Sequence, residues 1–156
     1  MNNPRLKKIA DARKAVKAAK TLAEKQEIFL NFISTFFNIK NRSTYEPGPT
    51  ASCSYYSRKN YGCAIGIFLS PKTAKFLDKK HFCEKTGIFM NSSIHMVLLS
   101  TRKNKIPKWM RDLGLPFLSK IQTLHDMGEN WDEHGLTAAG RDTVAFIRKK
   151  FNLKEV

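Results

Sequence analysis

Apolar and polar positions alternate with the period of an α-helix over the first 38 residues. Apolar or small side chains recur every three or four residues, at Ile9, Ala12, Val16, Ala19, Ala23, Leu30, Ile33 and Phe37. This stripe is typical of an amphipathic helix with one buried face. Pro4 suits a first turn, whose N–H groups have no partner within the helix. The pattern predicts one long helix from Pro4 to about Asn38.

The two ends of this predicted helix differ in character. Lysines and arginines surround small alanines in the first two-thirds, whereas the last third reads IFLNFISTFF. Because an alanine stripe buries little apolar surface, it contributes little stability. We therefore expect the C-terminal part to dock on the core and the N-terminal part to project as a basic arm. The predicted division is residues 1–40 as this helix and residues 41–156 as a compact α+β domain.

The next segment predicts a loop followed by a β-hairpin. Pro47, Gly48 and Pro49 indicate a loop or hinge over residues 41–52. The runs SCSYYS and CAIGIFL favour strands and flank RKNYG, in which Asn60 and Gly62 tolerate the positive φ angles of a tight turn. These runs predict one hairpin.

Capping residues predict the remaining helices. A short helix should follow Ser70 and Pro71, and SSIHMVLLS favours another. Gly114 breaks a third segment, from which a helix runs between about Pro116 and Gly128, and Thr137 caps the last helix. The predicted class is α+β, mostly α, with a long N-terminal helix, one β-hairpin and three to five further helices.

Charge narrows the range of partners. The chain has 28 Lys+Arg against 13 Asp+Glu, a formal net charge of +15. Such a charge excludes a DNA-mimic protein and favours an anionic partner, namely nucleic acid, a nucleotide, an acidic protein or a membrane surface. No apolar run approaches the roughly 18 residues of a membrane span. We expect a soluble protein with no membrane partner and no cofactor.

The three cysteines, Cys53, Cys63 and Cys83, form no CxxC pair and no regular framework. Their odd number and spacing fit reduced thiols in an intracellular setting. Cys63 lies between glycines in NYGCAIGIF, and as a catalytic nucleophile it would need a base brought close by folding, together with a lowered thiol pKa. The alternative, which we favour, is a buried cysteine beside glycines that permit a close backbone contact.

An acidic stretch stands out in this basic chain. In HDMGENWDEHG, four of the thirteen acids lie near His125 and His134. Imidazole and carboxylate groups transfer protons and bind divalent metals. One hypothesis is therefore a phosphoester hydrolase or nuclease site of His125 and Asp126 with Glu129 or His134. The spacing matches no metal signature, and no metal is predicted. We favour the alternative that His125 is a core or capping residue and that the acids form ion pairs.

Basic residues are interleaved with aromatic residues in two places. One is the predicted hairpin, with Tyr55 and Tyr56, and the other extends to Lys108 and Trp109. Cations neutralise phosphates and exposed aromatic faces stack on bases, although the same residues can also be a solvated face packed on core tyrosines. The predicted nucleic-acid-binding residues are Lys7, Lys14, Lys17, Lys25, Arg58, Lys59, Tyr61, Arg102, Lys103 and Lys105.

Several motifs resemble a family of small, mostly uncharacterised proteins of tailed bacteriophages and prophages. They are Cys53-Ser-Tyr55, Gly62-Cys63-Ala64-Ile65-Gly66, Gln122-Thr123-Leu124-His125-Asp126 and Trp131. The resemblance covers roughly residues 50 to 135. It implies a phage protein in the host cytoplasm that modifies a host process or counters host defence, and it implies no particular reaction.

These observations favour a non-enzymatic phage accessory protein that binds DNA or RNA with little sequence preference, mainly through phosphate contacts of the N-terminal helix and the hairpin. A second hypothesis is an inhibitor of a host protein, in which the first helix contacts a partner or a second copy in a homodimer. A third is a sponge for anionic nucleotides, and a fourth is the phosphoester hydrolase with its site at His125 and Asp126.

Overall fold

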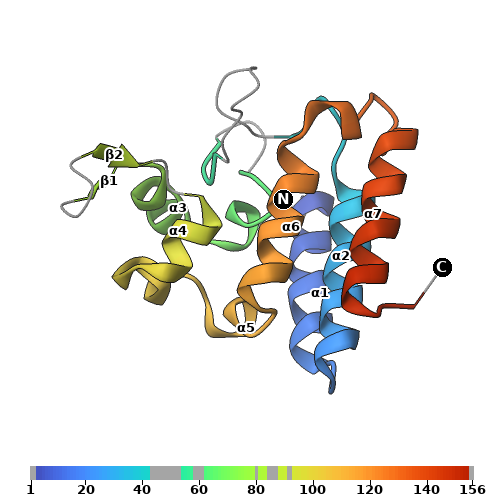
Figure 1. The fold of residues 1–156 in the computed structure, drawn as a ribbon, viewed down its shortest axis with the longest axis horizontal. Helices are drawn as coiled ribbons and strands as arrows, with labels where there is room; N and C mark the ends of the chain where they lie inside the picture. The colour runs from blue at the N-terminus through green and yellow to red at the C-terminus, as the bar shows by residue number, and fades with distance from the viewer. Residues whose placement is uncertain are drawn as a thin grey trace.

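The computed structural model describes residues 3–42, 54–57, 62–79, 81–83, 88–90 and 93–154. Seven α-helices account for most of these residues (Figure 1). They are α1 (Pro4–Ala18), α2 (Leu22–Phe36), α3 (Pro71–Asp78), α4 (Ile94–Leu99), α5 (Lys108–Arg111), α6 (Leu115–Asp126) and α7 (Ala138–Phe151). Three short 3-10 segments connect them, namely η1 (Gly66–Phe68), η2 (Thr101–Lys105) and η3 (Gly128–Asn130).

The predicted α+β class is wrong, because the architecture is helical. Strand pairing within the described ranges is limited to the three-residue segments β1 (His81–Cys83) and β2 (Ile88–Met90), which pair antiparallel. The predicted hairpin runs form no strand in their described parts, and Gly66–Phe68 is a 3-10 turn. The turn itself, at residues 58–61, lies outside the described residues, as do residues 43–52 of the predicted loop.

A side chain from α3 explains why the first of these runs is not a strand. The carboxylate of Asp78 accepts hydrogen bonds from the backbone N–H groups of Tyr55 (2.8 Å) and Tyr56 (2.9 Å). A strand would donate N–H groups to a neighbouring strand instead. The N–H of Cys63 donates to the carbonyl of Ser54 (2.8 Å), which holds the two runs together without a ladder.

The predicted single N-terminal helix is also wrong, because the chain breaks between α1 and α2. Thr21 and Glu24 form a capping box there. The Thr21 hydroxyl accepts from the N–H of Glu24 (3.2 Å), and the Glu24 carboxylate accepts from the N–H groups of Thr21 (3.0 Å) and Lys20 (2.9 Å). A capping box starts a new helix inside a continuous apolar pattern. As a result α1 packs along α2 and does not project as an arm (Figure 1).

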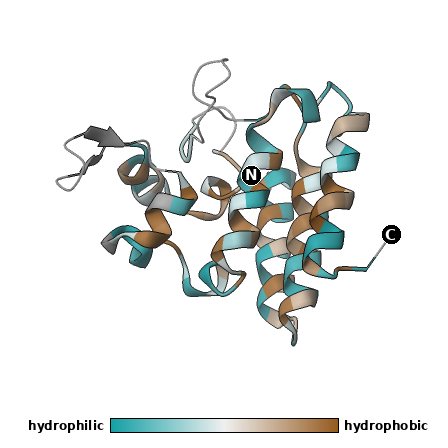
Figure 2. Cartoon of the chain, viewed as in Figure 1, coloured by the Kyte–Doolittle hydropathy of each residue, from teal (hydrophilic) through white to brown (hydrophobic). Residues whose placement is uncertain are grey.

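The core lies where α1, α2, α6 and α7 meet, and hydrophobic and hydrophilic positions alternate along these helices (Figure 2). Fully buried side chains include Phe29, Ile33, Phe117, Ile121 and Ile147. The predicted helix starts after Ser70, Gly114 and Thr137 are confirmed at α3, α6 and α7. No helix in the described ranges has the length and apolar character to cross a membrane.

Candidate nucleic-acid interface

Three of the predicted basic residues lie on α1, whose apolar face is buried. Ile9, Ala12 and Val16 are covered, so α1 presents its basic face to solvent. Lys7 and Lys14 are seven residues apart, about two helical turns, and both are exposed on that face. Lys7 pairs with Asp11 one turn along the helix at 2.7 Å. Of the three predicted lysines, Lys14 and Lys17 have no ion-pair partner among the described residues.

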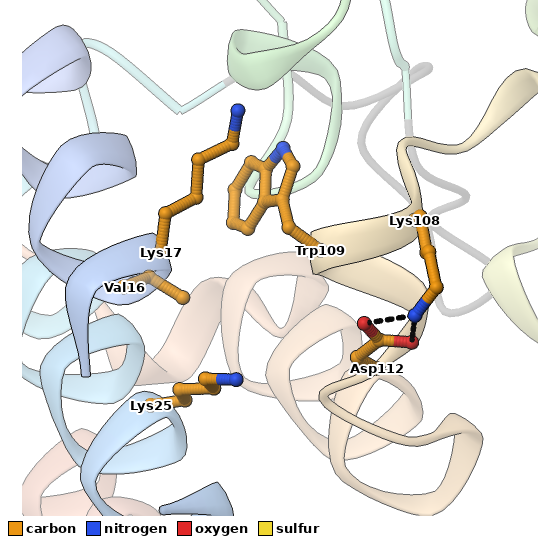
Figure 3. A pocket seen from close by; sticks show the side chains of 6 residues that line it. All are labelled: Val16, Lys17, Lys25, Lys108, Trp109 and Asp112. Atoms are coloured by element: carbon orange, nitrogen blue, oxygen red, sulfur yellow. Dashed lines mark hydrogen bonds and ion pairs between the residues drawn. The ribbon is translucent and has the colours of Figure 1, made fainter. Parts of the chain in front are cut away.

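A pocket of about 480 Å³ brings distant lysines together. Its lining comes from α1, from α2 and from α5 with the residue after it: Val16, Lys17, Lys25, Lys108, Trp109 and Asp112 (Figure 3). Lys17 lies near the end of α1 and Lys25 lies near the start of α2, and Lys108 and Trp109 begin α5 on the other side of the pocket. Three lysines therefore line one concavity against a single carboxylate.

The carboxylate of this pocket is already engaged. Lys108 donates to both oxygens of Asp112, at 3.0 and 2.7 Å. This hydrogen bond, followed by the charges of Lys108, Lys25 and Arg111, holds the pKa of the Asp112 carboxyl below its ordinary value. Lys17 and Lys25 have no ion-pair partner among the described residues, so their amino groups give the pocket its net positive charge.

Trp109 forms an aromatic wall of the same pocket. Its ring lies edge-on to Phe68 at 5.4 Å between centroids and 6.4 Å from Phe29, so aromatic side chains of the core hold it on one side. The indole is half-buried, and Lys17 reaches past it from α1 (Figure 3). The site thus combines amino groups with an aromatic surface, the two features that bind phosphates and bases.

The other predicted cations do not join this pocket. Arg102, Lys103 and Lys105 lie on η2, and Arg102 donates to the carbonyl of Phe76 in α3 (2.8 Å). The guanidinium of Arg102 and the amino group of Lys105 lie over the Phe76 ring, at 5.0 and 5.5 Å from its centroid. They form a second basic surface around an exposed aromatic ring. Arg58, Lys59 and Tyr61 lie outside the described residues.

The aromatic residues of the predicted hairpin divide between core and surface. Tyr55 is fully buried, and burial is the main cause that raises the pKa of its hydroxyl. Tyr56 is half-buried, with the Lys75 amino group 4.6 Å from its ring centroid. Tyr55 therefore has no face available for a base.

His125 is a core residue. Its side chain is fully buried, and its Nδ1 lies 2.8 Å from Oδ1 of Asp126, so the ring donates this hydrogen to the carboxylate. The ring of Phe37 stands edge-on to the imidazole at 4.7 Å. Burial lowers the pKa of His125, and the hydrogen bond to Asp126 offsets this effect only in part. The imidazole is thus closed off from solvent and from any substrate in this conformation.

The residues around His125 hold the end of α6 in place. The Arg42 guanidinium donates to the backbone carbonyls of His125 and Asp126. Trp131 is buried, and its indole N–H donates to the carbonyl of Leu124 (2.9 Å). The carbonyls that a helix C-terminus leaves without partners are thereby satisfied.

The acidic stretch after His125 makes turns and ion pairs. Asp132 accepts from the backbone N–H groups of His134 and Gly135, and Glu133 pairs with Lys40 at 3.1 Å. His134 and Glu129 are exposed, whereas His125 is buried. Within the described ranges, no three metal-ligating side chains converge. The geometry therefore brings Asp126 to His125 but neither Glu129 nor His134.

Cys63 is buried and disulfide-bonded. In this oxidised form it has no thiolate to act as a nucleophile. The expectation of three reduced thiols is therefore wrong at Cys63. The neighbouring glycines serve packing, because a Cβ on Gly62 or Gly66 would lie 2.0 or 1.9 Å from the carbonyl oxygen of Tyr55.

The sequence pattern indicated single residues of the pocket, but it did not indicate that these residues lie together in the fold. Basic and aromatic residues alternate up to Lys108 and Trp109, and this alternation was the signal for the α5 wall. The only sequence signal for Asp112, which accepts hydrogen bonds from Lys108, is its position four residues after that lysine. Only the fold places that wall against Lys17 and Lys25.

Comparisons with known protein families, with curated proteins and with solved structures found no match to this chain.

Proposed function

We propose that this chain is a small phage accessory protein that binds nucleic acid, DNA or RNA, through phosphate contacts and with little sequence preference. One observation supports this most directly. Lys17 and Lys25 line one pocket together with Lys108, which is distant from them in the sequence, beside the aromatic ring of Trp109. Two of these amino groups have no ion-pair partner among the described residues.

The chemistry of lysine fits this binding mode. An ammonium group is a compact charge on a flexible stem, so it neutralises a phosphate without reading a base. Lys7 and Lys14 extend positive charge along the exposed face of α1, and Arg102 and Lys105 add a second basic surface. Net charge of +15 adds long-range attraction to any polyanion.

The experiment compares two variants of equal charge. Lys17→Glu with Lys25→Glu alters the pocket, and Lys149→Glu with Lys150→Glu alters exposed positions near the end of α7. Each pair lowers the net charge by the same amount, so a difference between them isolates the pocket. Affinity for a fluorescent oligonucleotide is measured over a series of salt concentrations, after thermal melts establish that both variants fold.

We expect the pocket variant to lose about tenfold or more in affinity relative to the α7 variant. The slope of log K against log salt should fall in magnitude by about 1–2, as expected for two lost phosphate contacts. Equal losses in the two variants would show that the pocket is not the binding site. Absence of binding by the unaltered protein at low salt would overturn the proposed function itself.

A further inference from the structure

The pocket contains more than a phosphate contact requires. Bare phosphate binding needs only cations, yet a half-buried tryptophan forms part of this lining. Its ring contacts Phe68 and Phe29 on the core side, which restricts its rotation. A ring that is held in place loses little side-chain entropy when a ligand stacks on it. Trp109 is therefore preorganised to take a flat partner.

We propose that this pocket binds an unpaired nucleotide of a single strand, with its base stacked on Trp109 and the backbone phosphates on its two sides in contact with Lys17 and Lys25. The inference rests on the proposed function and adds to it the class of nucleic acid. It also assigns a role to each group of the pocket: the indole contacts the base, and the amino groups contact the backbone.

The dimensions of the pocket support an unpaired ligand. A volume of about 480 Å³ lies within the range of about 300–1,000 Å³ that is typical of pockets for small molecules. A nucleotide in a duplex keeps its base stacked and paired, so it enters a pocket only after extrusion from the helix, which costs stacking and pairing energy. A single strand offers splayed bases without that cost.

The arrangement of charges fits the same ligand. Lys17 and Lys25 approach from two different helices, while Asp112 holds the third amino group, that of Lys108, to one side (Figure 3). The Lys17 side chain lies beside the indole and the Lys25 side chain lies farther along the pocket, so two amino groups without ion-pair partners among the described residues are available to the backbone on either side of a stacked base (Figure 3). Because every base has a flat face, stacking of this kind tolerates any sequence.

Intrinsic fluorescence tests this inference with little ambiguity. The chain has two tryptophans, and Trp131 is 3% exposed with its indole N–H bonded to the carbonyl of Leu124. Quenching by an added oligonucleotide therefore reports on Trp109. The probes are a short oligothymidine, an abasic strand with the same number of phosphates, a duplex, and thymidine monophosphate.

We expect oligothymidine to quench the emission and to bind about tenfold or more tightly than the duplex at the same salt concentration. The abasic strand should bind without quenching. Trp109→Leu should lower the affinity for oligothymidine by about tenfold, with no change for the duplex, and Trp109→Phe should restore part of the loss. A Trp109→Phe protein retains only Trp131 and should show no quenching.

The outcomes separate this inference from the proposed function. Equal binding of single strand and duplex, without quenching by either, would overturn the inference and leave phosphate binding intact. Quenching by thymidine monophosphate at concentrations as low as those of the strand would overturn it in favour of a free nucleotide. Should no polymer bind at low salt, the proposed function and the inference both fail.

Discussion

The environment of one residue, His125, decides between a catalytic and a structural role for the acidic stretch. A general acid or base must reach the proton that it transfers, within a hydrogen bond or through one water molecule. His125 is fully buried, one ring nitrogen bonds to Asp126, and the other has no hydrogen-bond partner among the described residues. Its packing against Phe37 indicates that it stabilises the end of α6.

This role predicts how stability depends on pH. Because burial lowers the pKa of His125 in the folded protein below the unfolded value of about 6.5, the unfolded chain binds the proton more readily. The full contribution is present above pH 6.5, and the free energy of unfolding should fall as the pH drops below that value. Denaturant unfolding at a series of pH values measures the slope.

The matched variant is His125→Gln, which cannot titrate. Its free energy of unfolding should be lower by about 2–3 kcal/mol at neutral pH, because a buried ring and its hydrogen bond are lost. Its slope between about pH 5 and 6.5 should be shallower than that of the unaltered protein. Identical slopes in the two proteins would mean that the imidazole titrates freely, as an accessible catalytic group does.

At the scale of elements, the contact between residues 54–57 and the turn from Gly62 to Phe68 replaces the predicted hairpin. The carbonyl oxygen of Tyr55 sits where side chains at Gly62 and Gly66 would be. Gly62 also has φ +109°, a conformation that other residues rarely adopt. The GCAIG motif is therefore explained by close backbone packing.

This contact predicts the effect of a single methyl group. Gly66→Ala should lower the free energy of unfolding by about 1–3 kcal/mol, because its Cβ would meet backbone atoms that must shift. Gly128→Ala is the control, since its Cβ would meet only the end of the Arg42 side chain, at 3.4 Å. We expect the control to stay within about 0.5 kcal/mol of the unaltered protein. Urea unfolding of the three proteins measures the difference, and equal stabilities would contradict the packing role.

The break between α1 and α2 belongs to the same scale. Both helices follow the apolar period that predicted one helix, but the capping box at Thr21 and Glu24 satisfies the first N–H groups of a second helix. The chain then reverses, and α1 packs along α2. The buried face of α1 consists of Ile9, Ala12 and Val16, and the lysines of α1 face solvent.

At the scale of the whole molecule, the net charge of +15 opposes folding by self-repulsion. Salt screens this repulsion over a Debye length of about 10 Å at 0.1 M. We therefore expect Tm to rise by a few degrees between low salt and about 0.15 M sodium chloride, while affinity for nucleic acid falls. Circular dichroism melts measure the first effect.

A less basic variant provides the comparison. Lys149→Glu with Lys150→Glu lowers the formal net charge by four, from +15 to +11, at exposed positions of α7. Its Tm should rise less with salt than that of the unaltered protein. A Tm that is insensitive to salt in both proteins would show that the excess charge is already balanced within the fold.

Local signals in the sequence determined the helix boundaries and the surplus of positive charge. Ser70, Gly114 and Thr137 mark helix starts because capping and positive φ depend on a few neighbouring residues. These signals were correct wherever no distant residue competed with them. The capping box at Thr21 is also a local signal, but the apolar period continues across it, and the prediction of one helix followed that period alone.

Tertiary structure decided what depends on residues distant in the sequence. The Asp78 carboxylate accepts hydrogen bonds from the N–H groups of Tyr55 and Tyr56, in a run that was predicted to be a strand. His125 is buried and packs against Phe37, which separates it from solvent. The pocket likewise exists only because the fold brings Lys108 and Trp109 of α5 to Lys17 of α1 and Lys25 of α2. Periodicity and capping are signals that extend over one or two helical turns, whereas contacts between residues distant in the sequence depend on which apolar faces pack together.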